Sequence, residues 1–147
     1  MKKYLILILV IFATTMVARA DRYTINRDEL PQEAREMLDK HFPKAKIGMI
    51  KVDRHLLKKT DYDVRLVNGT KIEFSNAGKW TSVDCITREV PSALIPSTIR
   101  RYIFKNYQDV KVVKIEKKAS GYEIDLSDGV ELKFSLLGQF KGVKLDD

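Results

Sequence analysis

The sequence predicts an α+β fold made of two tandem α-β-β-β-β modules, each an antiparallel four-stranded sheet with one face covered by a helix. Three observations lead to this prediction. An internal repeat spans most of the chain, each copy opens with an amphipathic helix pattern, and each copy contains an Asn-Gly or Asp-Gly hairpin signal. A module of about 55 residues is marginal on its own, and the connection at 86–89 is short, so we expect the modules to share an interface.

The internal repeat is the strongest signal in this chain of 147 residues. Residues 25–85 match residues 90–145 in the spacing of apolar residues, in a Leu-Pro or Ile-Pro pair, and in both turn glycines. The offset between matching positions is 65 before a short insertion and 60 after it, so the first copy carries five extra residues. Chance would not keep these features together. The repeat therefore predicts modules at 21–88 and 89–147.

Each copy opens with apolar residues on one face of a helix. Their shared spacing is i, i+4, i+7, i+8 and i+12, which is the period of an amphipathic helix. Pro31 and Pro96 suit the first helical turn, where an N–H has no partner, and Pro43 ends the first helix. The apolar residues are Leu30, Ala34, Met37, Leu38 and Phe42 in the first copy, and Ile95, Ile99, Tyr102, Ile103 and Tyr107 in the second.

Four strands are predicted after each helix. Apolar and charged residues alternate on both sides of Asn68-Gly69, which predicts a two-residue hairpin turn, and Asp128-Gly129 repeats the pattern. Hairpin-length connections imply antiparallel pairing, and alternation implies one apolar face under the helix and one charged face. The predicted strands lie near 47–52, 61–66, 71–75 and 80–83, and near 110–117, 122–126, 132–134 and 140–143.

The first 20 residues have the layout of a secretory signal peptide. Two lysines precede an unbroken apolar run at 4–13, and a small-x-small sequence ends at Ala20. The run is shorter than a membrane span requires, so we expect cleavage after Ala20, a periplasmic or secreted protein, and no transmembrane span after cleavage. An uncleaved anchor is the alternative.

Cleavage removes three of the 27 basic residues and none of the 20 acids, which leaves a net charge of +4 and indicates no nucleic-acid partner.

No pattern of catalytic or metal-binding residues stands out. His41 is replaced by Asn106 in the second copy, His55 lies in the insertion, and neither has a Ser or Cys at motif spacing. Residues 125–129 lack the third ligand and the closing Glu of a calcium loop. The lone Cys85 suits a buried apolar position, with a reactive thiol or an intermolecular disulfide as the alternatives. We therefore predict no enzyme activity, no metal site and no cofactor.

The core and turn residues shared by the two copies form a known pattern. They are Leu30-Pro31, Phe42-Pro43, Tyr62, Val64, Leu66, Asn68-Gly69, Ile72, Phe74 and Gly78, with counterparts from Ile95-Pro96 to Gly138 and Phe140. In these residues the chain resembles the PepSY-like proteins, small exported bacterial proteins with a fold like that of the beta-lactamase inhibitory protein. The resemblance covers essentially all of the chain after residue 20. It implies a tandem α/β body whose sheets form a concave protein-binding surface, in a family proposed to restrain peptidases or to act in the cell envelope. It brings no catalytic motif and no specific inhibitory loop, so inhibition of a beta-lactamase is not inferred.

Charged residues on the exposed sheet face are the first candidates for partner contact. One interpretation is a solvated face held by cross-strand opposite charges, and the other is a polar docking surface for a protein. The predicted contact residues on this face are Asp63, Arg65, Lys71 and Glu73 in the first copy, and Glu123, Asp125, Glu131 and Lys133 in the second.

Basic residues at the tips of the first hairpin in each copy are the second candidates. They could meet an anionic envelope surface or an acidic partner, whereas a long hairpin with solubilising lysines is the alternative. The predicted contact residues are Arg54, Lys58 and Lys59 in the longer tip, and Lys117 and Lys118 in the shorter one.

The functional hypothesis is an exported, non-enzymatic protein-binding module with an unknown envelope or secreted partner. Restraint of a peptidase or another envelope hydrolase is its most concrete form. The alternative hypothesis is a periplasmic protein that binds a small ligand or a metal ion.

Overall fold

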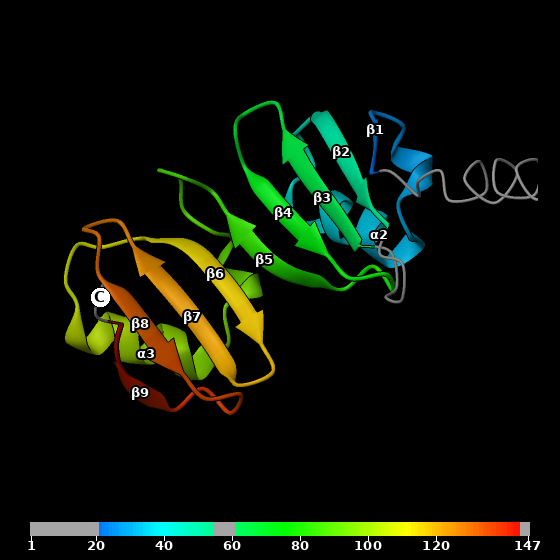
Figure 1. Cartoon of the computed structure of the whole chain (residues 1–147). Coiled ribbons are helices and arrows are strands. Elements are labelled where there is room, and N and C mark those ends of the chain that lie inside the picture. The colour runs from blue at the N-terminus through cyan, green and yellow to red at the C-terminus, as the bar shows by residue number, and fades with distance from the viewer. Residues whose placement is uncertain (1–20, 55–60, 145–147) are drawn as a thin grey trace, which may run out of the picture.

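The computed structural model describes residues 21–54 and 61–144. Its strands form one sheet of nine, arranged in sequence order and antiparallel throughout (Figure 1). The strands are β1 Arg22–Thr24, β2 Ile47–Asp53, β3 Asp61–Leu66, β4 Lys71–Phe74, β5 Trp80–Asp84, β6 Val112–Lys118, β7 Gly121–Leu126, β8 Glu131–Phe134 and β9 Phe140–Val143. The helices are α2 Gln32–His41 and α3 Ser97–Asn106, and the short 3-10 turns η1 Arg27–Glu29 and η2 Ser92–Leu94 precede them.

The predicted fold class, two modules with separate four-stranded sheets, is wrong. β5 pairs with β6, with Val83 opposite Ile115, and this pairing joins the strands of 21–88 to those of 89–147 in one sheet. The physical reason is that each separate sheet would expose an edge strand with unpaired N–H and C=O groups, whereas the joined sheet pairs these two edges with each other. A ninth strand that the sequence pattern did not predict, β1, lies against β2.

The hairpin turns also differ from the prediction. The Leu66 N–H donates to Thr70 O at 2.8 Å and the Gly69 N–H donates to Leu66 O at 3.0 Å, so the loop between β3 and β4 has three residues, 67–69, in place of two. Leu126 and Val130 make the same contact at 2.8 Å in the β7–β8 hairpin. The length of the loop decides which residues are opposed: with three loop residues Asp63 lies opposite Glu73, whereas a two-residue loop would place it opposite Ile72.

The hydrophobic core is continuous along the sheet. It runs from Leu30 before α2 to Phe134 on β8, and Cys85, Val90 and Leu94 lie in the middle of it. Cys85 is 4% exposed, and burial raises the pKa of its thiol, which fits the predicted apolar role. Each fully buried aliphatic or aromatic side chain contributes about 1.5–3 kcal/mol. The largest are Phe74, Phe134, Ile50, Ile72, Ile99, Ile115, Ile124, Leu126 and Leu132.

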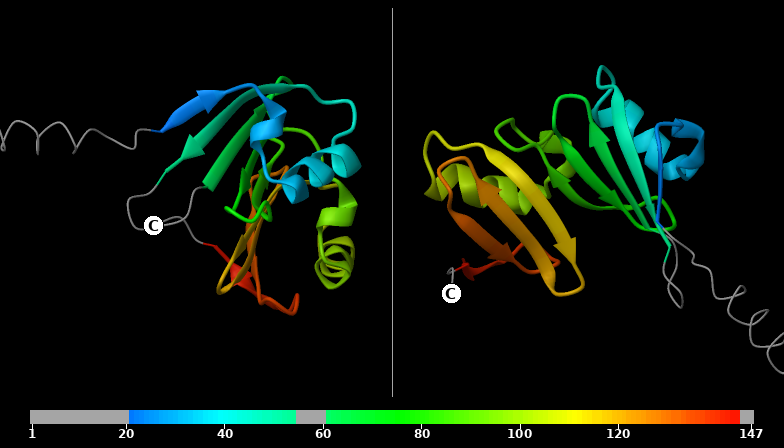
Figure 2. Two further views of the ribbon diagram at one scale, coloured as in Figure 1. Left: turned by 90° about the vertical axis from the view of Figure 1, so that its right-hand side faces the viewer. Right: turned by 45° about the horizontal axis from the view of Figure 1, so that its top comes forward.

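Both helices cover the same face of the sheet (Figure 2). They lie where the apolar spacing predicts them, and Pro31 and Pro96 occupy the cap position one residue before each helix. α2 buries Ala34, Met37 and Leu38, and α3 buries Ile99 and Ile103. The opposite face is turned towards the viewer in Figure 1 and is called the open face below; no helix of residues 21–54 and 61–144 lies on it.

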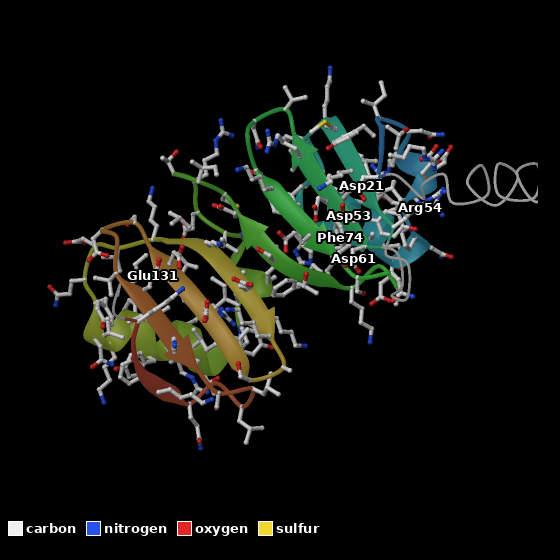
Figure 3. The ribbon with its side chains drawn as sticks, in the orientation of Figure 1. Asp21, Asp53, Arg54, Asp61, Phe74 and Glu131 are labelled. Carbon is white, nitrogen blue, oxygen red and sulfur yellow. The ribbon has the colours of Figure 1, made fainter. Side chains whose placement is uncertain are left out.

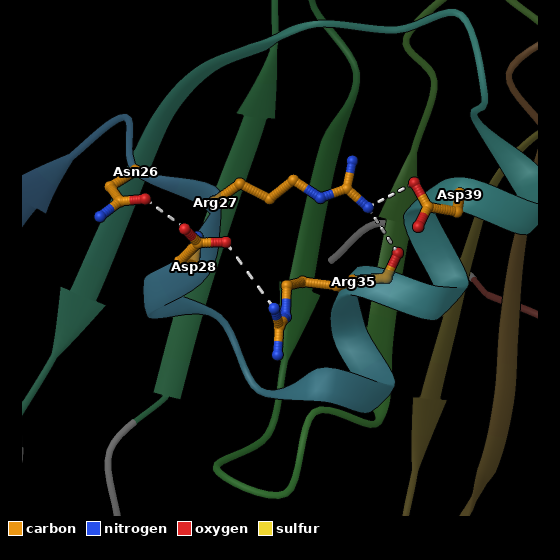
Figure 4. Close-up of polar contacts among 5 residues, drawn as sticks. All are labelled: Asn26, Arg27, Asp28, Arg35 and Asp39. Carbon is orange, nitrogen blue, oxygen red and sulfur yellow. Dashed lines mark hydrogen bonds and ion pairs between the residues drawn. The ribbon is translucent and has the colours of Figure 1, made fainter.

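Polar contacts hold the segment before α2 against that helix (Figure 4). The Asn26 side chain accepts a hydrogen bond from the Asp28 N–H at 3.0 Å. The Arg27 guanidinium donates to Arg35 O at 2.9 Å and to the Asp39 carboxylate, and Arg35 lies 3.7 Å from Asp28. These contacts fix η1 on the helix side, away from the open face.

Candidate functional site

The open face carries two rows of polar side chains that run across the sheet. Within each row, every residue lies opposite the next on the neighbouring strand. The first row is Lys51, Asp63, Glu73, Ser82, Glu116, Glu123 and Lys133. The second row is Met49, Arg65, Lys71, Asp84, Lys114, Asp125 and Glu131. Because β5 and β6 pair, the two rows form one surface, and all eight predicted sheet-face residues lie on it.

Three of the four directly opposed pairs among these eight residues carry like charges. Like charges directly opposite destabilise a sheet, whereas opposite charges contribute roughly 0.2–1 kcal/mol per pair. Along the two complete rows, five directly opposed pairs carry opposite charges and four carry like charges, so cross-strand attraction explains only part of the arrangement. Among the eight predicted residues, the like-charged pairs are Asp63 with Glu73, Arg65 with Lys71, and Asp125 with Glu131, and the oppositely charged pair is Glu123 with Lys133.

Ion pairs neutralise only part of this surface. In the described part of the chain, neither Arg65 nor Lys71 has a carboxylate within 4.0 Å. Glu123 is better compensated, because a hydrogen bond from Lys118 lowers the pKa of its carboxyl. The ion pairs on the open face are Lys51–Asp53 at 3.1 Å, Lys51–Asp21 at 3.9 Å, Lys118–Glu123 at 3.1 Å, Lys144–Glu131 at 3.5 Å and Lys144–Glu123 at 3.8 Å.

A depression of about 310 Å³ lies on the open face of the first half of the sheet. β3 and β4 each contribute one acidic and one basic residue to its lining. An acidic pair and a basic pair therefore lie side by side. All four predicted first-copy residues are brought together here. The lining side chains are Met49, Lys51, Asp63, Arg65, Lys71 and Glu73.

Two carboxyl groups beside this depression, Asp53 and Asp63, are hydrogen-bonded to each other. Burial, together with a hydrogen bond to Asp53 and the charges of Asp53 and Glu73, raises the pKa of Asp63 to about 6. Burial acts against ionisation of Asp53 as well, but hydrogen bonds from Asp63 and Lys51 hold the pKa of Asp53 below its ordinary value. Asp21 also hydrogen-bonds to Asp53 (Figure 3). Asp63 therefore keeps its proton up to about pH 6 and is mostly ionised at neutral pH.

Replacing Asp63 with asparagine is expected to weaken a pH dependence of stability. An unfolded Asp loses its proton near pH 4, but native Asp63 keeps it to about pH 6. The native state thus binds more protons between these values, so the free energy of unfolding falls as pH rises from about 4 to about 6. The lowered pKa of Asp53 acts below this window.

Urea denaturation at about pH 4.5 and about pH 7.5 measures this effect. The natural protein should be more stable at the lower pH, and Asp63→Asn should reduce the difference. Glu33→Gln, at an exposed position of α2, is the control and should leave it unchanged. An equal difference in Asp63→Asn and the natural protein would contradict the prediction.

Comparison with known proteins identifies the family. The family described as "Putative beta-lactamase-inhibitor-like, PepSY-like" matches residues 60–142, which is more than half of the chain. The chain belongs to this PepSY-like family. The resemblance drawn from the core and turn residues is confirmed. A comparison with curated proteins finds no match for this PepSY-like chain.

Three solved structures resemble the PepSY-like chain over most of its length. A "putative periplasmic protein of unknown function" from Bacteroides vulgatus is 40% identical, with 85% of this chain and 99% of that chain covered and a TM-score of 0.81. A "putative calcium-regulated periplasmic protein" from Bacteroides thetaiotaomicron is 36% identical, with 85% and 97% covered and a TM-score of 0.80. A "putative periplasmic protein from DUF2874 family" of Bacteroides vulgatus is 36% identical, with 87% and 99% covered and a TM-score of 0.80.

The three neighbours agree with the predicted periplasmic location. The three neighbours are described as periplasmic, and neither they nor the family are described as enzymes. In residues 21–54 and 61–144, no helix has the length and apolar character needed to cross a membrane. Over the same ranges, no group of three or more His, Cys, Asp or Glu side chains is arranged to hold a metal ion.

Of the two predicted basic tips, the shorter one is described in full, and its Lys117 and Lys118 lie on opposite sides of the sheet. Lys118 belongs to the open face through Glu123, whereas the Lys117 ammonium lies 5.9 Å from the centre of the Tyr122 ring. Lys117 also lines a groove on the helix side. Arg54 is exposed after β2, and Lys58 and Lys59, like His55, lie outside the described residues.

The open face also contains residues that the sequence analysis did not single out. They come from β2 at one end of the rows and from the β5–β6 junction in the middle. Alternation along 47–53 and 112–118 is the signal that points to them, but their place beside the predicted residues depends on strand order. These residues are Met49, Lys51, Asp53, Ser82, Asp84, Lys114 and Glu116.

Proposed function

We propose that this PepSY-like chain is an exported, non-enzymatic protein-binding module that contacts its partner through the open face. The observation that carries the proposal is the register of like charges, Asp63 opposite Glu73 and Arg65 opposite Lys71. A face shaped only by its own stability would favour opposite charges at these positions. A partner with the complementary arrangement would neutralise both pairs at once, and such complementarity gives specificity and fast association.

Several further observations support this proposal. The open face is continuous over nine strands and neither α2 nor α3 lies on it, so a protein-sized contact surface is available (Figure 1). The depression beside Arg65 and Lys71 would receive an acidic side chain, and the neighbouring Asp63 and Glu73 a basic one. The periplasmic neighbours support export, with cleavage after Ala20 as part of the proposal.

Restraint of a peptidase or another envelope hydrolase is the most concrete form of the proposal. The family description, beta-lactamase-inhibitor-like, supports a restraining role in general terms. An inhibitor of this kind would act by covering its target with the open face, without chemistry of its own.

Charge reversal on the open face is expected to abolish partner capture. The test protein carries Asp63→Lys, Glu73→Lys, Arg65→Glu and Lys71→Glu, which keeps the net charge and reverses the pattern. The purified exported protein is used to capture partners from the envelope fraction and the medium of its host, read by quantitative mass spectrometry. The natural protein should enrich one partner. The charge-reversed variant should capture at least about tenfold less of that partner, because attractive charged contacts become repulsive.

The matched control reverses four exposed charges on the helix side, Glu33→Lys, Glu36→Lys, Lys40→Glu and Lys105→Glu, also at constant net charge. Circular dichroism must show that both variants fold. Equal capture by the natural protein and the open-face variant would contradict the proposal.

A ligand- or metal-binding function is the second candidate. It is favoured by the hydrogen-bonded carboxyl groups of Asp53 and Asp63, a place that a cation could occupy, and by the neighbour described as calcium-regulated. The capture experiment is therefore repeated with calcium and with a chelator, alongside thermal melting. A calcium-dependent rise in melting temperature that Asp63→Asn removes would favour this candidate, whereas the protein-binding proposal predicts capture without calcium.

A further inference from the structure

A basic-rimmed groove lies away from the rows of the open face. It has a volume of about 510 Å³ and forms where three connections meet: the α2–β2 loop, the β3–β4 hairpin and the segment after β5. This volume lies within the range of about 300–1,000 Å³ that is typical of small-ligand sites. Its lining combines an apolar wall, built from Phe42, Pro43, Ala45 and Val67, with three cations, Lys44, Lys46 and Arg88.

The apolar wall is partly open to solvent. Val67, at the hairpin loop, is 69% exposed. Phe42 and Ala45 are half-buried and pack against the core from behind, so they cannot turn away from the groove without losing core contacts. An exposed valine beside a phenylalanine and a proline gives an apolar molecule a surface to cover, which stabilises by about 25 cal/mol per Å² of area removed from water.

The three cations have no acidic partner in the described part of the chain. No carboxylate lies within 4.0 Å of the Lys44, Lys46 or Arg88 head groups there. All three residues are exposed, and long basic side chains can lie along apolar surface while they keep the charge at its edge. The groove therefore presents positive charge at the rim of an apolar wall.

Hydrogen bonds hold the three connections in place. The Val67 N–H donates to Lys46 O at 2.8 Å, which ties the hairpin loop to the α2–β2 loop. The Arg88 N–H donates to Cys85 O at 3.0 Å, and the Ile86 N–H donates to the Asp84 carboxylate at 2.9 Å. The backbone of all three walls is thus preorganised, which lowers the cost of binding.

The equivalent corner of the second half has a different chemistry. The Ser127 N–H donates to Lys111 O at 2.8 Å, the same contact that Val67 makes with Lys46. There, however, Ser127 stands where the first half has Val67, and Asp109 stands where it has Lys44. The combination of apolar wall and unpaired cations is therefore a property of the first half, and the fold alone does not require it.

We propose that this groove binds a small amphiphilic anion, a carboxylate-headed molecule with an apolar body. The carboxylate would lie among Lys46, Lys44 and Arg88, and the apolar body would cover Phe42 and Val67. The site is independent of the protein-binding proposal, because none of its lining residues belongs to the two polar rows of the open face.

Octanoate is the probe, with acetate to test the charge alone and octanamide to test the apolar body alone. Binding to the purified exported protein is followed by amide chemical shifts in two-dimensional NMR. Octanoate should give saturating shifts at residues 42–46, 67–68 and 88. Acetate and octanamide should bind at least fivefold more weakly.

Matched variants test the assignment to this groove. Lys46→Gln with Arg88→Gln should weaken octanoate binding at least fivefold, whereas Lys111→Gln with Lys105→Gln, which removes the same charge elsewhere, should leave it unchanged. The spectra themselves report whether each variant is folded. A single variant, Val67→Ser, tests the apolar wall and should weaken octanoate binding more than acetate binding. Shifts outside the groove, equal binding of acetate and octanoate, or no saturating shift would each overturn the proposal.

Discussion

Truncating Phe134 to alanine is expected to lower the free energy of unfolding by about 3–5 kcal/mol. Phe134 is 1% exposed and sits where β8, β9 and α3 meet. Its ring lies 5.5 Å from Tyr102 and 5.7 Å from Phe140 in edge-to-face geometry, and these two rings stack on each other at 4.4 Å. Removing the ring loses the free energy of transferring it out of water. It also leaves a cavity between the helix and the strands it covers, which adds a further cost.

Urea denaturation at neutral pH measures this loss, and Phe104→Ala is the matched control. Phe104 lies on α3 but is 87% exposed, so its truncation is expected to change the free energy of unfolding by less than about 0.5 kcal/mol. A similar loss for both variants would contradict the position of Phe134 in the core.

Replacing Gly121 with alanine is expected to destabilise the protein by at least about 3 kcal/mol. Gly121 begins β7 with φ at +140°, and a Cβ at this position would lie 2.0 Å from the Phe134 backbone oxygen. Neither atom belongs to a flexible side chain, so the β7–β8 pairing itself would have to shift. The cost combines an unfavourable backbone conformation with damage to a central pair of strands.

Gly129→Ala separates these two contributions. Gly129 also has a positive φ, +91°, but a Cβ there would meet nothing within 4 Å. Its replacement should cost only the conformational part, about 1–2 kcal/mol. The measurement is again urea denaturation, and equal losses for the two variants would show that the predicted clash with Phe134 does not occur.

The local elements could be predicted from the sequence because each has a local cause. The apolar spacing through Ala34 and Leu38 produces one buried helix face, and the same argument holds for Ile99 and Ile103. The alternation of apolar and charged residues identifies the side of each strand that faces the core. It also identifies the eight charged residues that share the open face.

The long-range pairing could not be predicted in this way. Alternation in β5 and β6 fits an edge strand and an interior strand equally well, so nothing in the residues around Val83 indicates that Ile115 lies opposite. The pairing of charges depends on the loop length. Val64 and Ile72 both face the core, and when they lie directly opposite each other the loop has three residues and Asp63 lies opposite Glu73. The two-residue turn that Asn68-Gly69 predicts would instead place Asp63 opposite Ile72.

The sequential strand order has a consequence for how the chain folds. Six of the eight strand pairings connect chain neighbours across short loops, so their loop-closure entropy is small. The other two pairings each span a 3-10 turn and a helix: β1 with β2 across residues 25–46, and β5 with β6 across residues 85–111. Sheets of such low contact order fold faster than sandwiches of similar size. A chain that emerges from a translocation channel N-terminus first could therefore complete β1 to β5 while the rest is still in transit, and the β5–β6 pairing would be the step that commits both halves to one body.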